Sequence, residues 1–311
     1  MDPLTHLIEL LRPRSFLWKE LTGRGAWEWR FSALDGVVFG YVVSGCCRFE
    51  VPGGGEHEMG PGDYLLLTNP QPWFLRGGEG AAVSVDFDTA YAAMGNEDLL
   101  VDARPGQGDE EATRMVAGHF EFDSINAGLL ASLLSPVVRL PAGQRGEREF
   151  LPRVLTMIEA EATSDGPGRE AVMSRLLEIM LIELLRTPQL ASSRRGMLSG
   201  LTDPPIAAAL RAFHSDIQRP WSVAMMAAEA CLSRSAFSDR FTSVVGEPAM
   251  TYVLNWRMAV ARDALVAGRQ SVAQVAAATG YGSVSAFSTA FSRVVGVSPL
   301  RYAQGALSTT A

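Results

Sequence analysis

Residues 235–246 read SAFSDRFTSVVG, and residues 285–296 read SAFSTAFSRVVG, so that eight of twelve positions are identical fifty residues apart. In both segments apolar residues recur at i, i+4, i+7 and i+8, which is the period of a helix with one buried stripe. The stripes are Phe237, Phe241, Val244 and Val245 in the first segment and Phe287, Phe291, Val294 and Val295 in the second. The repeat therefore predicts one amphipathic helix in each copy.

A shorter helix is predicted ahead of each of these two. Ser222, Val223, Ala227 and Ala228 correspond to Ser271, Val272, Ala276 and Ala277 at an offset of forty-nine residues. The first copy breaks at Cys231-Leu232 and the second at Gly280-Tyr281-Gly282, with Ser233 and Ser283 as the expected N-caps. Helix, turn and helix, present twice, is the geometry of a DNA-binding helix-turn-helix. The alternative, a helical repeat array, generally needs three or more units, and only two are visible.

Around this repeat, over about residues 205–302, the sequence resembles the AraC/XylS family of bacterial transcription regulators. The matching elements are Pro220-Trp221-Ser222-Val223, Ser233-Arg234-Ser235-Ala236-Phe237, Val245-Gly246-Glu247-Pro248, Trp256-Arg257-Met258, Gly280-Tyr281, Ala286-Phe287, Gly296-Val297-Ser298-Pro299 and Tyr302. The resemblance implies two helix-turn-helix motifs, at 222–246 and 271–296, and a double-stranded DNA operator as partner, with RNA polymerase as a candidate second partner. Cys231 departs from the pattern, because the family usually has glycine there and a positive φ would strain a cysteine.

The segment between the motifs predicts a long helix. Its apolar positions, at spacings of four, four, three and four, are Met250, Leu254, Met258, Ala261 and Leu265, and Gly268 ends it. Such a helix sets the distance between the two reading helices, for which about 34–36 Å is the useful separation on one face of DNA. An ordinary core helix would show the same pattern, and both descriptions can hold together.

The faces opposite the phenylalanines are predicted to meet the bases. They carry Ser235, Ser238, Asp239 and Thr242 in the first copy and Ser285, Ser288, Thr289 and Ser292 in the second. These faces lack the Arg, Asn or Gln that pair bidentately with guanine or adenine, so direct readout is expected to be sparse. Asp239 either accepts from cytosine N4 or orients a neighbouring arginine, and we favour the second role, with Arg234 or Arg240 as partner.

Arginines supply the expected phosphate contacts, which position a protein without reading sequence. The candidates are Arg234, Arg240, Arg257, Arg262, Arg293 and Arg301, and we expect about half of the arginines in this region to touch DNA. The whole chain has a net charge of -7, whereas residues 201–311 carry nine basic and six acidic side chains. This modest positive balance predicts tight binding to a specific operator and weak affinity for other DNA.

Length and composition predict a two-domain α+β protein. At 311 residues the chain exceeds one typical domain. It has no apolar run long enough to span a membrane and no secretory pattern, and three cysteines fit a reducing cytoplasm. We expect four parts: a cupin-like effector-sensing domain at 1–148, a helical pair at 149–187, a linker at 188–203, and an all-α DNA-binding domain at 204–311.

The first 130 residues read mostly as strand. Cys47, Phe49 and Val51 alternate with polar residues, as do Val83, Val85 and Phe87, and Gly/Pro turns punctuate the segment. Short strands with such turns suggest a barrel or sandwich. This part also resembles, more loosely, the cupin-type sensor domain that precedes the paired motifs in many AraC/XylS regulators. The best local match is the Gly-Asp-Tyr-Leu-Leu-Leu run at 62–67.

Catalytic cupins hold a metal through clustered histidines, and this chain has only His6, His57, His119 and His214. Trp73 occupies the stretch where a histidine commonly follows the Gly-Asp strand in cupins. We therefore expect no metal, no cofactor and no enzymatic activity, and a cupin-like metal enzyme with an appended binding module is the less favoured alternative.

The predicted task of the barrel is to hold a small effector. The candidate pocket residues, each of which would also suit a plain core, are Trp27, Trp29, Tyr41, Phe49, Trp73 and Phe74. A second hypothesis is an oxidant sensor acting through Cys46 and Cys47, although buried cysteines usually act as small hydrophobes. The helices predicted between Phe150 and Arg186 either form a homodimer face or cover the barrel, and the sequence leaves the two open.

Overall fold

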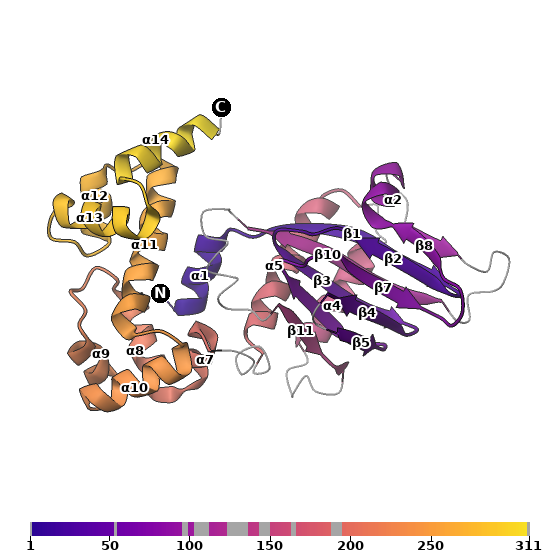
Figure 1. Ribbon diagram of the computed structural model, residues 1–311, viewed down its shortest axis with the longest axis horizontal. Coiled ribbons are helices and arrows are strands. Elements are labelled where there is room, and N and C mark those ends of the chain that lie inside the picture. The colour runs from indigo at the N-terminus through magenta and orange to yellow at the C-terminus, as the bar shows by residue number, and fades with distance from the viewer. Residues whose placement is uncertain are drawn as a thin grey trace. The chain divides into compact units, whose positions relative to one another are not determined.

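We describe a computed structural model of the chain (Figure 1). The structure describes residues 2–52, 55–94, 99–102, 112–122, 136–142, 150–162, 166–187 and 195–309. Contacts divide these residues into two compact units. One unit holds the strands and the two helices that follow them, and the other holds the C-terminal helices together with the first helix of the chain.

The strand-rich unit is built from two facing sheets. One sheet has the strand order β11-β6-β3-β10-β1-β9, and the other has the order β5-β4-β7-β2-β8. Within each sheet the neighbours pair antiparallel except at one edge, where β9 and β8 run parallel to β1 and β2. The strands are β1 (Arg14–Arg24), β2 (Trp27–Phe31), β3 (Val37–Ser44), β4 (Cys47–Val51), β5 (Gly55–Met59), β6 (Tyr64–Thr68), β7 (Trp73–Gly77), β8 (Val83–Asp86), β9 (Leu99–Asp102), β10 (Thr113–Glu121) and β11 (Val137–Leu140). The β-rich fold predicted for this part of the chain is confirmed.

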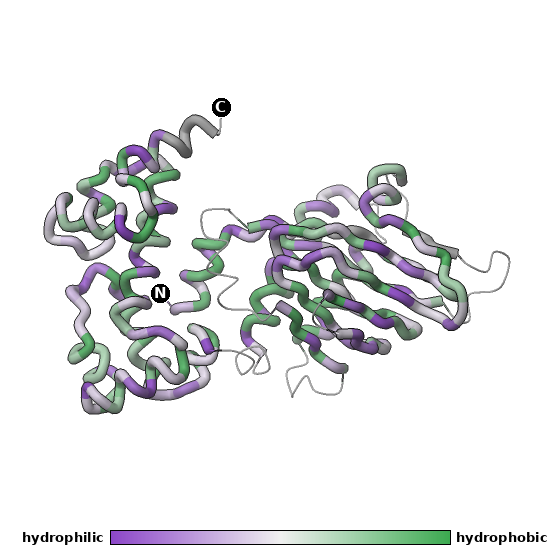
Figure 2. The backbone as a smooth tube through the Cα atoms, in the orientation of Figure 1, coloured by the Kyte–Doolittle hydropathy of each residue, from purple (hydrophilic) through white to green (hydrophobic). Residues whose placement is uncertain are grey.

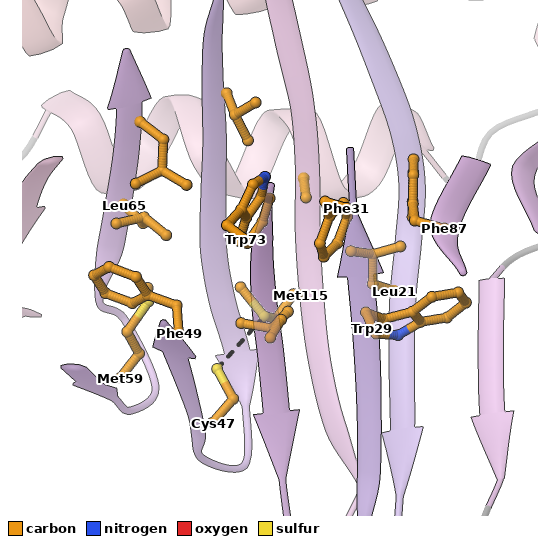
Figure 3. Close-up of a cluster of buried hydrophobic side chains, with 14 of the residues drawn as sticks. Leu21, Trp29, Phe31, Cys47, Phe49, Met59, Leu65, Trp73, Phe87 and Met115 are labelled. Atoms are coloured by element: carbon orange, nitrogen blue, oxygen red, sulfur yellow. Dashed lines mark hydrogen bonds between the residues drawn. The ribbon is translucent and has the colours of Figure 1, made fainter. Parts of the chain in front are cut away.

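The space between the sheets is filled by apolar side chains (Figure 3). Phe31 of β2 stacks on Trp73 of β7 with ring centroids 3.9 Å apart, and Phe87 covers Phe31 at 4.6 Å. The facing sheet contributes residues such as Leu65 and Met115. Alternation along each strand directs one set of residues into this core, which explains the striped hydropathy of the strands in Figure 2.

The run at Gly62–Leu67 closes the turn before β6. Gly62 has φ +85°, a conformation that favours glycine, and the Asp63 carboxylate accepts hydrogen bonds from the amide of Gly60 at 3.2 Å and that of Ala142 at 2.9 Å. Arg139 donates to the same carboxylate at 2.9 Å. Asp63 thus joins the turn to β11 and the residues after it, a structural role for the best cupin-like stretch of the sequence.

Two helices follow the strands: α4 (Phe150–Ala162) and α5 (Arg169–Leu185). Leu177, Met180, Leu181 and Leu184 on α5 are fully buried, and the Tyr64 hydroxyl on β6 donates to Met180 Sδ at 3.4 Å. α5 therefore covers the outer face of the larger sheet. Other apolar residues of the pair stay exposed, and these are Phe150, Met157, Val172 and Ile179.

One predicted strand ends earlier than its alternation suggests. Val83 to Asp86 form β8, but Phe87 begins the helix α2 (Phe87–Met94). The Asp86 carboxylate accepts hydrogen bonds from the amide and hydroxyl of Thr89, at 3.0 and 2.6 Å. An aspartate in this position caps a helix, and the cap overrides the period-two pattern.

The C-terminal unit is all helical, as predicted. Its helices are α7 (Met197–Thr202), α8 (Pro204–Ser215), α9 (Val223–Glu229), α10 (Arg234–Val245), α11 (Ala249–Ala267), α12 (Val272–Ala278), α13 (Val284–Val295) and α14 (Pro299–Thr309). α7 lies inside the segment 188–203 that we predicted as linker, where its residues Met197 and Leu198 are buried.

The first helix of the chain, α1 (Pro3–Leu11), packs within this C-terminal unit. It contacts α8 and α11, and its residues Leu7 and Leu11 are fully buried. Our predicted boundaries placed residues 1–12 in the sensor domain. Those boundaries stay a prediction, but the contacts of α1 lie with helices some two hundred residues further along the chain.

Candidate nucleic-acid interface

The two motifs repeat in structure as they do in sequence. Ser222 and Ser271 cap the first helix of each copy, and Ser233 and Ser283 cap the second, each accepting a hydrogen bond from a backbone amide of the first turn. Gly246 and Gly296 end α10 and α13 in the left-handed conformation. Capping serines and a terminal glycine therefore set the helix boundaries in both motifs.

The tight turn between the paired helices has the same geometry in both copies. Cys231 has φ +53° and its counterpart Gly280 has φ +79°. In each turn the next residue donates its amide back at 2.9 Å, from Leu232 to Ala227 O and from Tyr281 to Ala276 O. The positive φ that we anticipated at Cys231 is present.

The buried stripes hold the second helices in place. Phe237, Phe241, Phe287 and Phe291 are completely buried, and each helix packs its pair of rings in a tilted arrangement, with centroids 5.4 Å apart in α10 and 5.6 Å apart in α13. Val294, predicted to belong to the stripe, is instead 41% exposed. Phenylalanine burial thus fixes which face of α10 and α13 turns outward.

The outward faces carry the predicted base-facing residues. Five of the eight are exposed: Ser235, Asp239, Thr242, Ser285 and Thr289. The others, Ser238, Ser288 and Ser292, are half-buried at the edge of the same faces. These faces thus present hydroxyl groups and one carboxylate to solvent.

The predicted arginines fall into two groups. Arg234, Arg240, Arg293 and Arg301 are exposed, whereas Arg257 and Arg262 on α11 are buried and half-buried. Arg257 donates to the carbonyl oxygens of Ile217 and Arg219, at 2.7 to 3.0 Å. It therefore holds the segment between α8 and α9 against α11.

Arg240 has a partner other than the one we favoured. Its Nε donates to both carboxylate oxygens of Asp203, at 3.1 and 2.9 Å. Asp203 also caps α8 by accepting from the amide of Ile206. The carboxylate that orients Arg240 is thus at the start of α8, and Asp239 on its own helix remains exposed.

α11 connects the motifs as predicted, although Met250 of the predicted apolar stripe is 36% exposed. It runs for 19 residues, about 28 Å at 1.5 Å per residue, and Gly268 ends it in the left-handed conformation. Met258, Ala261 and Leu265 from α11 join Phe287 and Phe291 in one core. The helix is therefore both a spacer and a core element of the second motif.

The predicted effector residues divide between the two sides of the sheets. Trp27, Trp29, Phe49 and Trp73 lie in the core between the sheets, whereas Tyr41 and Phe74 alternate with core residues and are half-buried on the outer faces. Phe74 lies beneath the Arg76 guanidinium, 5.0 Å from the ring centroid. The six residues therefore do not share one pocket.

Trp29 places a polar N–H group in the apolar core between the two sheets. Its side chain is 1% exposed, and its indole Nε1 has no hydrogen-bond partner among the described residues. Its ring meets Phe87 edge-on at 5.9 Å. A buried N–H without an acceptor costs about 1–3 kcal/mol, which makes Trp29 a costly position among the described residues of the core.

The two adjacent cysteines have different surroundings. Cys46 is exposed, whereas Cys47 is 3% exposed and its thiol donates to Met115 Sδ at 3.6 Å (Figure 3). Burial, with smaller effects of Cys46 and Asp63, raises the pKa of Cys47 to about 12. Since the thiolate is the reactive form, Cys47 is unreactive at neutral pH.

The described residues contain no group of three or more His, Cys, Asp or Glu side chains that could hold a metal ion. His57 stacks on Phe49 at 4.8 Å, and His119 stacks on Phe16 at 4.9 Å. His6 and His214 lie together in the other unit, 3.3 Å apart between their Nδ1 atoms. Sequence reasoning missed this pair, because two hundred residues separate its members and neither occurs in a recognisable motif.

Comparisons with known proteins match both halves of the chain. A family model described as Cupin matches residues 2–188, and one described as Helix-turn-helix domain matches residues 226–305. Proteins described as putative AraC-like transcription regulators are 37% identical in Streptomyces lividans and 36% in Streptomyces antibioticus. Each alignment covers 97% of this chain and 98% of the relative.

The solved structure of ToxT from Vibrio cholerae O395 aligns over 95% of this chain and 97% of its own, at 13% identity and a TM-score of 0.36. No helix in the described part of this chain has the length and apolar character needed to cross a membrane.

Proposed function

The chain belongs to the AraC-like transcription regulators, with a cupin domain before a helix-turn-helix domain, and we propose that α10 and α13 read two neighbouring stretches of one DNA operator. The observation that carries this proposal is the duplicated motif, in which buried phenylalanines turn a hydroxyl-rich face of each second helix outward. A helix in this setting enters the major groove with its N-terminal residues at the base edges.

The phosphate contacts are assigned to the exposed arginines. Arg234, Arg240, Arg293 and Arg301 are exposed, with Asp203 holding the Nε of Arg240, whereas the bonds of Arg257 to backbone carbonyls commit it to the interior. We leave Arg257 out of the proposed set. RNA polymerase stays a candidate partner of the bound regulator.

Selection of bound sequences from a random oligonucleotide pool tests this assignment. We expect two short motifs about one helical turn apart, roughly 34–36 Å. Ser235→Ala should weaken or relax one motif and Ser285→Ala the other. Gly282→Ala, an exposed change with nothing within 4 Å, is the matched control and should leave both motifs intact. Recovery of no sequence preference, or loss of both motifs from either serine change, would contradict the proposal.

We further propose that the cupin domain senses a small effector and that its two states place the readers differently on the operator. The unpartnered Nε1 of Trp29 in an otherwise apolar core supports an effector that carries a hydrogen-bond acceptor. The test is a screen of metabolites for those that shift both the melting temperature and the operator affinity of the whole protein. Trp29→Phe should abolish the shift in operator affinity, and a response that persists in this variant would reject the assignment.

The exposed apolar residues on the helical pair support a homodimer. Phe150, Met157, Val172 and Ile179 remain on the surface while α5 covers the sheet with its other face. We propose that this surface joins two copies. Sedimentation should show a dimer that Met157→Glu converts to a monomer, whereas Glu178→Lys on α5 should leave it intact; a wild-type monomer at all concentrations would exclude this arrangement.

A further inference from the structure

α1 is held in the C-terminal unit by apolar and charged contacts. Leu7 and Leu11 are fully buried, and Leu4, Ile8 and Leu10 are nearly so. Arg12, which follows the helix, pairs with Asp263 of α11 at 3.0 Å. Asp2 caps the helix by accepting from the amides of Leu4 and Thr5. α1 is therefore a capped helix that packs against α8 and α11 through buried leucines and one ion pair.

A histidine network lies where α1 meets those two helices. Trp256 Nε1 donates to His6 Nδ1 at 3.3 Å, and the same His6 nitrogen is 3.3 Å from His214 Nδ1. His214 Nε2 is 2.7 Å from the Tyr252 hydroxyl. The His6 ring meets those of Trp256 and His214 edge-on, at 5.4 and 5.5 Å. One side chain from α1, one from α8 and two from α11 thus share three close polar contacts.

These contacts fix the protonation of both rings. An indole N–H can only donate, so His6 Nδ1 must present its lone pair to Trp256. The facing nitrogen of His214 must then carry a proton, because two lone pairs would otherwise oppose each other. His214 Nε2 is left as an acceptor, which the Tyr252 hydroxyl satisfies as donor. Both histidines are neutral in this arrangement, and a second proton on His6 could enter only at Nδ1, where two N–H groups already point.

The charges around His6 and His214 do not counteract this preference for neutral rings. Burial lowers the pKa of His6 below its usual value, with Glu9 raising it and the amino terminus lowering it by lesser amounts. Burial and the proximity of His6 lower the pKa of His214 to about 3, with Asp2 acting in the opposite direction. From α11 the facing groups are Tyr252, which stays neutral because burial raises its pKa, and the Arg12 partner Asp263.

We propose that His6 and His214 form a proton-sensitive latch, which holds α1 against α8 and α11 when both rings are neutral and releases it when they take up protons. The direction of the pH effect on docking follows from proton linkage. Released α1 exposes both imidazoles to water, where their pKa is near 6.5, so the released state binds more protons than the docked state below that pH. Docking is therefore strongest above pH 6.5 and weakens as the pH falls below it.

The expected effect is large enough to measure. Between pH 7.5 and 5.5 a histidine with pKa 6.5 in the released state and no protonation in the docked state weakens docking about tenfold. His214 stays unprotonated in the docked state over this pH range. If His6 also stays unprotonated while docked, the two histidines together weaken docking about a hundredfold. The latch does not depend on the proposed DNA contacts.

Hydrogen–deuterium exchange of the whole protein tests the latch without DNA. Protection factors of the amides at 4–11, corrected for the intrinsic effect of pH, should fall at least about tenfold between pH 7.5 and 5.5. The buried core of α13 around Phe287 and Phe291 serves as the internal reference and should keep its protection. Unchanged protection of α1, or an equal fall in α13 that signals general unfolding, would overturn the proposal.

Two variants test whether His6 and His214, and not other groups that titrate in acid, cause the pH effect on α1. His6→Asn keeps an acceptor near the Nδ1 position, and combined with His214→Gln it should reduce the pH effect on α1 to less than about twofold. His57→Gln, in the sensor sheet, is the matched control and should behave as the wild type does. A pH effect that survives the double substitution would reject the histidines as its source, and the wild-type measurement stands whether or not the double variant folds.

Discussion

Gly280 and Arg257 lie so close together that a Cβ atom on Gly280 would be 2.6 Å from Nη2 of the arginine, and equally close to the carbonyl oxygen of Gln218. Gly280 also has φ +79°. The turn of the second motif therefore needs glycine for two independent reasons, backbone conformation and space.

Gly280→Ala should lower the free energy of unfolding of the helical unit by about 2–4 kcal/mol, combining the left-handed penalty with displacement of Arg257. Urea denaturation measures this. Gly282→Ala, two residues on with nothing within 4 Å of its Cβ, should cost less than about 1 kcal/mol. Equal losses in the two variants would show that the contact with Arg257 is unimportant.

Cys231→Gly should have the opposite sign. Cys231 occupies the corresponding turn at φ +53° and is exposed, so glycine relieves about 1–2 kcal/mol of strain while costing about 0.5–1 kcal/mol in backbone entropy. We expect a net gain of up to about 1.5 kcal/mol in the same denaturation assay. Cys231→Ala keeps the strain and should bring no gain; stabilisation by alanine as well would point to the thiol instead of the backbone.

Arg257→Met should destabilise the protein by about 2–4 kcal/mol, because it removes the donor to the Ile217 carbonyl and leaves the Arg219 carbonyl with the Trp221 amide alone. Arg293→Met, an exposed change on α13, should leave the denaturation midpoint unchanged and reduce the slope of operator affinity against salt by about one phosphate contact. An unaltered salt slope for Arg293→Met would remove that residue from the proposed phosphate set.

Cys47 should resist alkylation. With its pKa raised to about 12 by burial, almost none of it is thiolate at pH 8, whereas Cys46 and Cys231 are exposed. Mass spectrometry after iodoacetamide treatment of the folded protein should find label on Cys46 and Cys231 alone, with Cys47 reacting after denaturation. Rapid labelling of Cys47 in the native state would revive the oxidant-sensor hypothesis.

Trp29→Phe should cost less stability than Trp27→Phe. The first change removes an unpartnered buried N–H along with some ring volume, and these effects partly cancel. Trp27 packs so tightly on Gly23 and Gly77 that a Cβ on either would approach its indole to 2.2–2.4 Å, so phenylalanine there leaves a cavity worth about 2–3 kcal/mol. A larger loss for Trp29→Phe would imply that its N–H has a partner in the folded protein.

The sequence predicted those features whose determinants lie within a few residues of one another. Ser233 and Ser283 cap helices, Gly246 and Gly296 end them, and the phenylalanine spacing identifies the buried face. Each is a local rule that tertiary contacts reinforce. The same reasoning failed at Phe87, where the alternation continued but the Asp86 cap started a helix.

Long-range contacts were beyond such reasoning. Nothing in the spacing of α11 residues distinguishes Arg257, whose partners at 217 and 219 turn it inward, from the exposed arginines of the proposed phosphate set. Likewise the pairing of Arg240 with Asp203 spans 37 residues, and that of His6 with His214 spans 208. The six candidate pocket residues divide between the core and the outer faces of the sheets. Predicting that division requires the strand register, which alternation alone does not fix for Tyr41 and Phe74.

The position of α1 bears on how regulators of this design can be rebuilt. A gene fusion that replaced everything before about residue 190 with a foreign domain would discard α1, and with it the leucines that complete the core beside α8 and α11. Exchange of the N-terminal domain at a single crossover is therefore handicapped here, and a chimaera that keeps this core would have to carry residues 2–12 together with the C-terminal helices.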